Sequence, residues 1–307
     1  MPALSVVIPT HERLEVLPEV LAALAAQQDA PELEVVVVDD GSRDGTAAFL
    51  AGYGGALPLT VLRQENRGPA AARNAGVAAA RSPLVAFLGD DTVPEPGWAA
   101  AHAAAHERRP QRRPLAVLGY TGWHPRMRTT PFLRYINEHG LQFGYALITD
   151  PEQVPFNFFY TSNISLPRDL LLAEPFDVAF PHAAWEDVEL SYRLQRRHGL
   201  TMVYESAARV AHLHPTDFAR FSRRQEKAGE SAVVFFRLHP ELGAFLGLSA
   251  AGPPPLPNGR RRRLQDTLVR ALQNLPVHTP KLWEDTLRDH YIRGLWRGWE
   301  RMRASTP

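Results

Sequence analysis

Four short apolar segments dominate the first 90 residues, and each ends at polar or turn-forming residues. They span residues 4–8, 33–38, 59–62 and 84–88. The first is apolar on both faces, which is typical of strands inside a parallel sheet that helices cover on both sides, and the second repeats its pattern. Helix-like segments follow the first three, and Thr10 is a suitable N-cap for the first helix, over residues 14–24. This alternation predicts an α/β fold with a doubly wound, mainly parallel sheet and helices on both faces.

The second half of the chain is less regular. A helix-like segment over residues 99–109 leads to a strand at residues 115–119, and residues 120–181 are rich in aromatic residues and prolines. Long irregular stretches inside a compact domain are usually functional or mobile. A helix opens near residue 185 and a strand-like segment covers residues 203–214. A proline-rich break at residues 253–257 then precedes two helical patterns in a basic, aromatic C-terminal extension.

The composition narrows the classes of function. The chain of 307 residues contains no cysteine, which excludes disulfides, zinc–thiolate sites and thiol nucleophiles. Its 34 basic and 33 acidic side chains give a net charge of +1, so no overall field favours nucleic acid as a partner. The N-terminus lacks the features of a secretory signal, and no apolar run approaches the roughly 18 residues that a membrane span needs. We expect a cytoplasmic protein, and peripheral contact with the inner face of the membrane stays open.

Polar clusters stand at the ends of all four early strands. They are Pro9 with Thr10, residues 39–44, residues 66–73, and Asp90 with Asp91. In doubly wound sheets, ligands bind beyond the carboxyl ends of the strands. The coincidence of polar clusters with strand ends therefore predicts a functional site there.

Asp90 and Asp91 have two interpretations. They can present a carboxylate to a divalent cation, because Mg²⁺ and Mn²⁺ prefer oxygen ligands and seldom need many from the protein, or they form a hydrated strand end. His212 and His214 are two apart in a strand-like segment, so both point to one face and either could complete the coordination. A lone histidine is more often structural.

Three other groups have similar alternatives. Glu186 and Asp187 stand where a helix begins, and a carboxylate there is either a general base or a helix cap. Arg73, on the first turns of another helix, suits a phosphate or a surface ion pair. Asp39 and Asp40 could accept hydrogen bonds from a base or ribose, or form turns with their own backbone. None of these groups is decisive alone.

Jointly, however, these segments resemble the large inverting family 2 of glycosyltransferases, whose fold is the nucleotide-sugar-binding GT-A type. The matching segments are VVIPT at 6–10, VVDDGSRDGT at 37–46, NRG and ARNAG within 66–76, FLGDD at 87–91 and WEDVEL at 185–190. Asn163 and residues 176–177 match the acceptor-side segment of the family. The resemblance covers about residues 4–215, and the joint occurrence of the motifs is far more specific than any one of them.

The resemblance implies a role for each matching position. The implied nucleotide-sugar-binding residues are Pro9, Thr10, Glu12, Asp39, Asp40, Arg73 and Asp90. The implied metal ligands are Asp91, His212 and His214, for a Mg²⁺ or Mn²⁺ cofactor, and the implied catalytic residues are Asp187, as general base, and Glu186. One position departs from the family: where many relatives have Asp-Xaa-Asp, this chain has Gly89-Asp90-Asp91. We therefore expect Asp91 to hold the ion with help from His212 or His214.

The implied function is metal-assisted transfer of a sugar from a nucleoside-diphosphate sugar to an acceptor hydroxyl, with inversion. The acceptor would be a sugar, a lipid-linked glycan or a small molecule. Two alternatives stay open. One is a nucleotidyltransferase that makes sugar nucleotides, although such an enzyme usually has a glycine-rich loop after the first strand. The other is a catalytically degenerate nucleotide-sugar-binding protein.

The implied catalytic domain spans residues 1–245, with a donor half over about residues 1–119 and an acceptor half over about residues 120–245. Residues 246–307 form the linker and the helical extension. Residues 260–263 are all arginine, and Trp283, Trp296 and Trp299 follow them. These residues would either touch an anionic membrane surface or dock on the protein's own domain or on a second subunit, as in a homo-oligomer. Docking is the favoured interpretation.

Overall fold

The computed structural model describes residues 3–109, 113–273 and 280–304. The chain divides into two compact units. Unit 1 comprises Met1–Met127, Phe143–Val178 and Asp187–His214, and unit 2 comprises Arg128–Gln142, Ala179–Glu186 and Pro215–Pro307. The predicted domain boundary between residues 245 and 246 lies inside unit 2.

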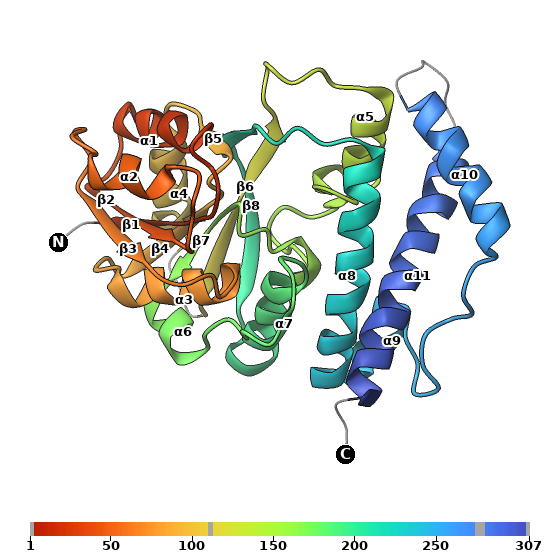
Figure 1. The fold of residues 1–307 in the computed structure, drawn as a ribbon. Helices are drawn as coiled ribbons and strands as arrows, with labels where there is room; N and C mark the ends of the chain where they lie inside the picture. Colours follow the sequence, from red (N-terminus) through yellow and green to blue (C-terminus); the bar gives the residue numbers. More distant parts are fainter. Residues whose placement is uncertain (1–2, 110–112, 274–279, 305–307) are drawn as a thin grey trace. The chain divides into compact units, whose positions relative to one another are not determined.

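The strands of unit 1 form one sheet in the order β3-β2-β1-β4-β7-β6-β8-β5 (Figure 1). Its strands are β1 (Leu4–Thr10), β2 (Leu33–Asp39), β3 (Leu59–Arg63), β4 (Leu84–Leu88), β5 (Thr92–Pro94), β6 (Leu115–Trp123), β7 (Asn163–Pro167) and β8 (Thr201–His212). The pairs β1–β2, β2–β3, β1–β4 and β6–β8 are parallel, whereas β7 is antiparallel to both its neighbours and β5 is antiparallel to β8. The predicted mainly parallel sheet is confirmed.

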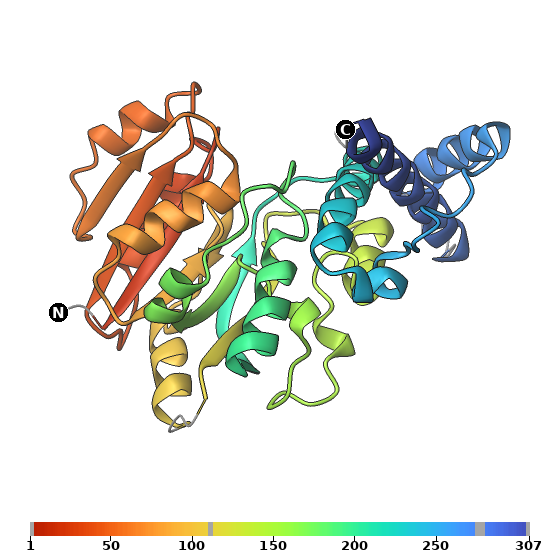
Figure 2. The same cartoon turned by 90° about the horizontal axis from the view of Figure 1, so that it is seen from below.

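Helices cover both faces of the sheet, as predicted (Figure 2). One face carries α1 (Leu17–Ala25), α2 (Thr46–Ala51) and α4 (Trp98–Glu107), and the other carries α3 (Pro69–Ala79), α6 (Arg168–Ala173) and α7 (Glu186–His198). Alternate residues of β1 divide between the two cores, with Val6 and Ile8 packed beside α1 and Val7 packed beside α3. Two short 3₁₀ helices, η1 (Tyr145–Leu147) and η2 (Phe156–Phe158), lie in the aromatic segment.

The prediction that Thr10 caps the first helix is wrong. Thr10 is the last residue of β1, where it pairs with Asp39 of β2. The helix begins only at Leu17, because its first turn contains Pro18, and its N-cap, Val16, makes no side-chain hydrogen bond. Residues 11–16 therefore form a loop at the carboxyl end of β1.

Unit 2 is helical. Its helices are α5 (Pro131–Glu138), α8 (Phe218–Leu238), η3 (Pro240–Leu242), α9 (Gly243–Leu246), α10 (Gly259–Leu272) and α11 (Pro280–Ala304). The last two match the predicted helical patterns, whereas α8 has no counterpart among the predicted elements. Within the described ranges, no helix combines the length and the apolar character that crossing a membrane requires.

Helices α8 and α11 approach each other through their backbones. A Cβ atom placed on Gly294 of α11 would lie 2.0 Å from the carbonyl oxygen of Glu226 in α8, and one on Gly229 of α8 would lie 2.2 Å from the carbonyl oxygen of Tyr291. The Glu226 carboxylate accepts hydrogen bonds from the Arg293 and Arg297 side chains of α11, at 2.7 Å each. Close glycine contacts and ion pairs therefore hold this helix pair together.

We expect Gly294→Ala to lower the free energy of unfolding by about 1–3 kcal/mol, because the new methyl group forces the two backbones apart. Urea-induced unfolding, followed by tryptophan fluorescence, measures the change. Gly259→Ala is the matched control, since a Cβ atom at that position of the same unit meets nothing within 4 Å. Equal stabilities of the two variants would contradict the close packing of α8 and α11.

Candidate functional site

The loops after β1 and β2 are tied together at the carboxyl ends of these strands. The Asp40 N–H donates to the Thr10 carbonyl oxygen and the Glu12 N–H donates to Ser42 Oγ, each at 2.9 Å. The Glu12 carboxylate accepts from the Arg43 N–H at 2.8 Å. Glu12 has a φ of 56°, in the left-handed region that non-glycine residues seldom adopt, so these bonds hold a strained conformation. Thr10 and Glu12, both predicted to bind the nucleoside, thus lie in one hydrogen-bonded loop pair.

Asp39 and Asp40 are buried, and their carboxylates hold neighbouring loops. Asp39 accepts the Ser42 N–H at 2.9 Å and lies 3.5 Å from the Arg63 side chain. Asp40 accepts the backbone N–H groups of residues 67 and 68, at 2.9 and 2.8 Å. Asp39 thus forms a turn with its own backbone, whereas Asp40 joins its loop to one at least 27 residues further along the chain. Contact of either residue with a nucleoside stays a prediction.

Arg73 and Pro9 lie on elements that border these loops. The Arg73 guanidinium lies over the Phe176 ring, 5.4 Å from its centroid, and Phe176 packs edge-on against Phe87 of β4. Pro9 is within β1, opposite Val38 of β2. Contact of Arg73 with a diphosphate stays a prediction, as does contact of Pro9 with a nucleotide sugar.

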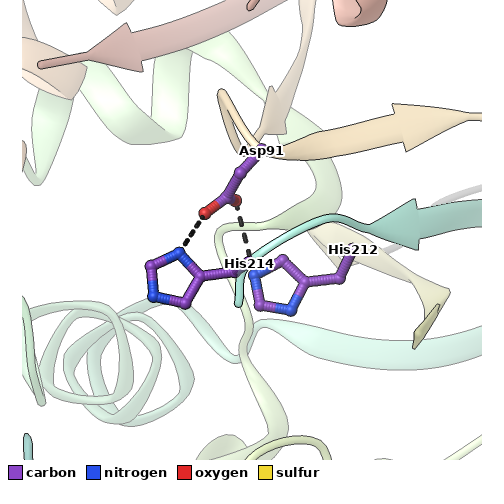
Figure 3. Close-up of side chains that lie close together, drawn as sticks. All are labelled: Asp91, His212 and His214. Carbon is purple, nitrogen blue, oxygen red and sulfur yellow. Dashed lines mark hydrogen bonds and ion pairs between the residues drawn. The ribbon is translucent and has the colours of Figure 1, made fainter. Parts of the chain in front are cut away.

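An acid–histidine cluster forms where β5 pairs with the end of β8. Thr92 is opposite His212 in this antiparallel pair, and the Leu213 N–H donates to the Asp91 carbonyl oxygen at 2.8 Å. The register places the Asp91 carboxylate 3.0 Å from His214 Nδ1 and 3.5 Å from His212 Nε2 (Figure 3). The structure therefore brings together all three predicted metal ligands.

The two histidines differ in their surroundings. Their rings lie nearly parallel with centroids 5.5 Å apart, as expected for residues two apart in extended backbone. His212 is buried, since Trp123 of β6 stacks on its ring and Phe143 packs against it edge-on. The side chain of His214 is 39% exposed, so it forms the open side of the cluster.

Arg13 also belongs to this cluster, although it was not among the predicted site residues. Its Nε atom lies 3.4 Å from Asp90 Oδ1, and its Nη2 atom lies 3.3 Å from Asp91 Oδ2 and 3.2 Å from His214 Nδ1. The only signal in the sequence was a basic residue in the loop after the first strand. Two adjacent carboxylates at the end of a neighbouring strand make such a residue a natural ion-pair partner.

The two carboxylates of the cluster differ in charge. Burial and the negative charge of Asp91 raise the pKa of Asp90 to about 7, although Arg13 opposes this. Burial alone would also raise the pKa of Asp91, but His212, His214 and Arg13 outweigh it and lower that pKa below its usual range. At neutral pH, Asp91 is therefore the carboxylate that is fully ionised and able to bind a cation.

The turn at Gly89 leaves little room for a side chain. A Cβ atom there would lie 3.1 Å from Thr92 Oγ1 and 3.2 Å from Asp91 Oδ1. A carboxylate at position 89 would therefore require Asp91 or Thr92 to shift. Glycine at position 89, where many relatives have the first Asp of Asp-Xaa-Asp, therefore suits this tight turn. The same turn places the Asp91 carboxylate beside the two histidines.

The cluster fits a divalent cation. Asp91, His212 and His214 each offer a ligand atom, and these atoms all lie within 4.8 Å of one another. One carboxylate oxygen and two imidazole nitrogens are ordinary ligands for divalent metal ions. Three protein ligands leave coordination positions for oxygens of a bound phosphate.

The candidate base lies at the start of α7. Asp187 Oδ1 accepts its neighbour's backbone N–H, from Val188, at 2.9 Å, and Oδ2 lies 3.4 Å from Thr161 Oγ1. Asp187 is half-buried and belongs to unit 1, whereas Glu186 is buried and belongs to unit 2. The helix N-terminus favours the ionised form of a carboxylate in its first turn. Thr161 was not predicted, because no motif near it in the sequence marks it as a functional polar residue.

Comparisons with known proteins agree on one family. The family model described as glycosyl transferase family 2 matches residues 5–163. The chain is similar to validoxylamine A glucosyltransferase of Streptomyces hygroscopicus subsp. limoneus, with 34% identity over 66% of this chain and 49% of that protein. It is also similar to chondroitin synthase of Escherichia coli, with 28% identity over 63% of this chain and 32% of that protein. The chain thus spans about half the length of the first relative and a third of the second.

Solved structures show the same fold. A mannosyltransferase from Pyrobaculum calidifontis, PcManGT, in complex with GDP-Man and Mn²⁺, has a TM-score of 0.64 and 17% identity, over 97% of this chain and 87% of that one. S. aureus TarS, residues 1–349, has a TM-score of 0.51 and 19% identity, over 99% of this chain and 92% of that one. At such identities the likeness shows the fold alone.

We expect Asp91→Asn to weaken Mn²⁺ binding about tenfold or more, because it removes the one ionised ligand of the cluster. Isothermal titration calorimetry with MnCl₂ measures the affinity. Asp90→Asn is the matched control and should retain most of the affinity, since Asp90 lies outside the three-residue cluster. The cluster would be excluded as the metal site if Asp91→Asn bound Mn²⁺ as tightly as the unchanged protein.

Proposed function

Because the chain belongs to glycosyl transferase family 2, we propose that it transfers a sugar from a nucleoside-diphosphate sugar to an acceptor hydroxyl, with inversion at the anomeric carbon. The observation that carries this proposal is the Asp91, His212 and His214 cluster at the strand ends of a family 2 fold. The similar mannosyltransferase is described with GDP-Man and Mn²⁺, and the similar TarS is described with UDP. These ligands support a donor of the nucleotide-sugar class.

We assign the donor to the carboxyl edge formed by β1, β2 and β4. Thr10, Glu12 and Asp39 face the nucleoside, and the polar loops that carry them are already fixed by hydrogen bonds before a donor binds. Such preorganisation reduces the entropy that binding must overcome. Arg73, at the start of α3, lies toward the diphosphate, where a guanidinium binds phosphate oxygens in pairs.

The divalent cation in this proposal is held by Asp91 with His212 or His214. A mixed set of one carboxylate and imidazoles favours Mn²⁺ over Mg²⁺, because Mg²⁺ prefers oxygen ligands. When bound, the cation supplies positive charge that stabilises the diphosphate as it leaves. His212 is the buried ligand on the inner side of the cluster. His214 is the exposed ligand on its open side.

Asp187 is the general base of the proposed reaction. It takes the proton of the acceptor hydroxyl, whose oxygen attacks the anomeric carbon while the bond to the diphosphate breaks on the opposite face. The hydrogen bond from the Val188 N–H and the contact with Thr161 orient the carboxylate, and the dipole of the helix N-terminus favours a negative charge there. Glu186, the other predicted catalytic residue, is buried at the same helix start, and its part in the reaction stays a prediction.

We expect Asp187→Asn to lower sugar transfer about 10²- to 10⁴-fold while nucleotide-sugar binding is retained, because the amide cannot accept the proton. UDP- and GDP-sugars with Mn²⁺ and an acceptor panel provide the assay, and the anomeric configuration of the product reports inversion. Asp169→Asn is the matched control: Asp169 also lies in the first turn of a helix, but that helix follows β7, which runs antiparallel to β4 and so ends at the opposite edge of the sheet.

This assay also separates the two alternatives. Full transfer by Asp187→Asn would remove the base assignment. Pyrophosphate release from a nucleoside triphosphate would indicate a nucleotidyltransferase. Donor binding without transfer by the unchanged protein, across the panel, would indicate a degenerate binding protein.

The C-terminal tryptophans are docked within unit 2. Trp283 is buried, the Trp296 indole N–H donates to the Pro254 carbonyl oxygen at 2.7 Å, and the Trp299 ring packs 6.2 Å from that of Phe236. The docking interpretation on the protein's own chain therefore holds for these residues. Self-association through the extension and a cytoplasmic location both stay predictions.

We propose that α10, in place of the tryptophans, supplies the peripheral membrane contact. Its inner face buries Val269, while Leu264 and Leu268 on its outer face are 63% and 43% exposed. Five arginines and one aspartate give the helix a net charge of +4, since 5 − 1 = 4. Exposed leucines beside arginines suit an anionic bilayer, which would bring the active protein to lipid-linked acceptors.

We expect Leu264→Gln with Leu268→Gln to weaken binding to phosphatidylglycerol-containing vesicles about tenfold or more, because two apolar side chains no longer enter the bilayer. Co-sedimentation at low and high salt measures the binding. Leu172→Gln is the matched control, since Leu172 is 46% exposed on α6 of unit 1. The membrane proposal fails if the unchanged protein does not bind these vesicles at low salt.

A further inference from the structure

Arg13 occupies the position in the acid–histidine cluster that a cation would take. Its Nη2 atom lies 3.3 Å from Asp91 Oδ2 and 3.2 Å from His214 Nδ1, and these two atoms are 3.0 Å from each other. Its Nε atom also lies 3.4 Å from Asp90 Oδ1. One guanidinium thus engages two atoms that can ligate a metal ion, together with the second carboxylate.

Arg13 and a divalent ion cannot share these atoms in this arrangement. A metal ion would need Asp91 Oδ2 and His214 Nδ1 as ligand atoms, and Nη2 already lies within 3.3 Å of both. The ion would also stand next to a positive charge in a partly buried setting, where repulsion is strong. A cation that binds the cluster must therefore displace the guanidinium.

The backbone of Arg13 is fixed, so its side chain alone would move. The Arg13 N–H donates to Thr46 Oγ1 at 3.3 Å, and its carbonyl oxygen accepts from Val16 and Leu17 at 3.1 and 2.9 Å. The side chain itself is one-third exposed. A long side chain on a fixed loop can leave the carboxylates by changing rotamers, and its planar donors suit a diphosphate.

We propose that Arg13 is a displaceable internal cation that couples metal binding to diphosphate binding. Without ligand, it neutralises Asp90 and Asp91 and keeps the divalent ion out. When a diphosphate arrives, the guanidinium transfers to the phosphate oxygens and frees Asp91 and His214 for the ion. This inference rests on the proposed function, since the diphosphate is that of the nucleotide-sugar donor, and it makes Arg13 a positioning residue that controls the order of ligand binding.

The test uses each ligand alone, so it does not depend on the identity of the sugar or on turnover. For Arg13→Gln, we expect MnCl₂ alone to bind about tenfold more tightly than to the unchanged protein, because the competing cation is gone. We expect inorganic pyrophosphate alone, in EDTA, to bind about tenfold more weakly, because its guanidinium partner is gone. Calorimetry measures both affinities. A merely structural role would not move them in opposite directions.

Matched variants keep the result interpretable. Arg108→Gln removes an arginine that pairs with Glu205 away from the cluster, and both affinities should stay unchanged. Arg13→Lys keeps the charge if the glutamine variant folds poorly, and its two affinities should fall between those of the glutamine variant and the unchanged protein. Arg13→Gln with Asp91→Asn should lose the gain in Mn²⁺ affinity.

Unchanged or weaker Mn²⁺ binding by Arg13→Gln would overturn the inference, as would unchanged pyrophosphate binding. Either result leaves the proposed function intact, because that function is decided by sugar transfer in the unchanged protein and in Asp187→Asn.

Discussion

The candidate site depends on the pairing of β5 with the end of β8. Three residues of β5 are enough to set the register in which Thr92 is opposite His212. That register brings Asp91 to two histidines more than 120 positions away in the chain. A shift by one residue would turn both histidines to the other side of the strand, because side chains alternate along extended backbone. The chemistry of the cluster is therefore a consequence of sheet geometry.

Charge balance is the second constraint on the cluster. Asp90 and Asp91 are adjacent and largely shielded from water, an arrangement that is unfavourable for two negative charges. The protein resolves it in two ways, by raising the pKa of Asp90 to about 7 and by placing Arg13 against both carboxylates. A site balanced in this way before any ligand binds has to rearrange its charges when a cation or a diphosphate enters. In the proposed order of binding, the Arg13 side chain makes this rearrangement, since it is one-third exposed and is carried by a backbone that hydrogen bonds hold in place.

The sequence predicts the sheet and the candidate metal ligands better than it predicts which residues contact them. Buried parallel strands read as continuous apolar runs, so β4 was predicted at its observed bounds, and the family and its GT-A fold are confirmed by the comparisons. Arg13 was missed because its role depends on strand neighbours 77 positions or more away, and no local pattern encodes them. Thr10 was given to a helix because cap propensity is local, whereas the pairing with Asp39 that extends β1 is not.

Helix α8 shows the same limit in unit 2. It packs against α11 through Gly229 and through the carboxylates of half-buried Glu226 and buried Glu230, where a helix prediction expects apolar side chains. The ion pairs of Glu226 with Arg293 and Arg297 make that face compatible with burial, but only once α11 is present. The sequence therefore left two interpretations open for the tryptophans of α11, membrane contact and docking. Their docking depends on packing partners that the hydrophobic pattern does not reveal.

The missing carboxylate at Gly89 and the two histidines at the end of β8 compensate for each other. A Cβ atom at position 89 would lie 3.2 Å from Asp91 Oδ1, so a second acidic ligand there would require Asp91 or Thr92 to shift. His212 and His214 offer ring nitrogens as ligand atoms instead. In the proposed reaction this difference changes the charge that the donor meets: an ion held by one carboxylate and neutral imidazoles keeps a net positive charge, whereas two carboxylates would cancel it. In the proposed site, histidine ligands in place of a second acid would leave more of the cation's charge for the diphosphate, which is where the transition state of the proposed reaction needs it.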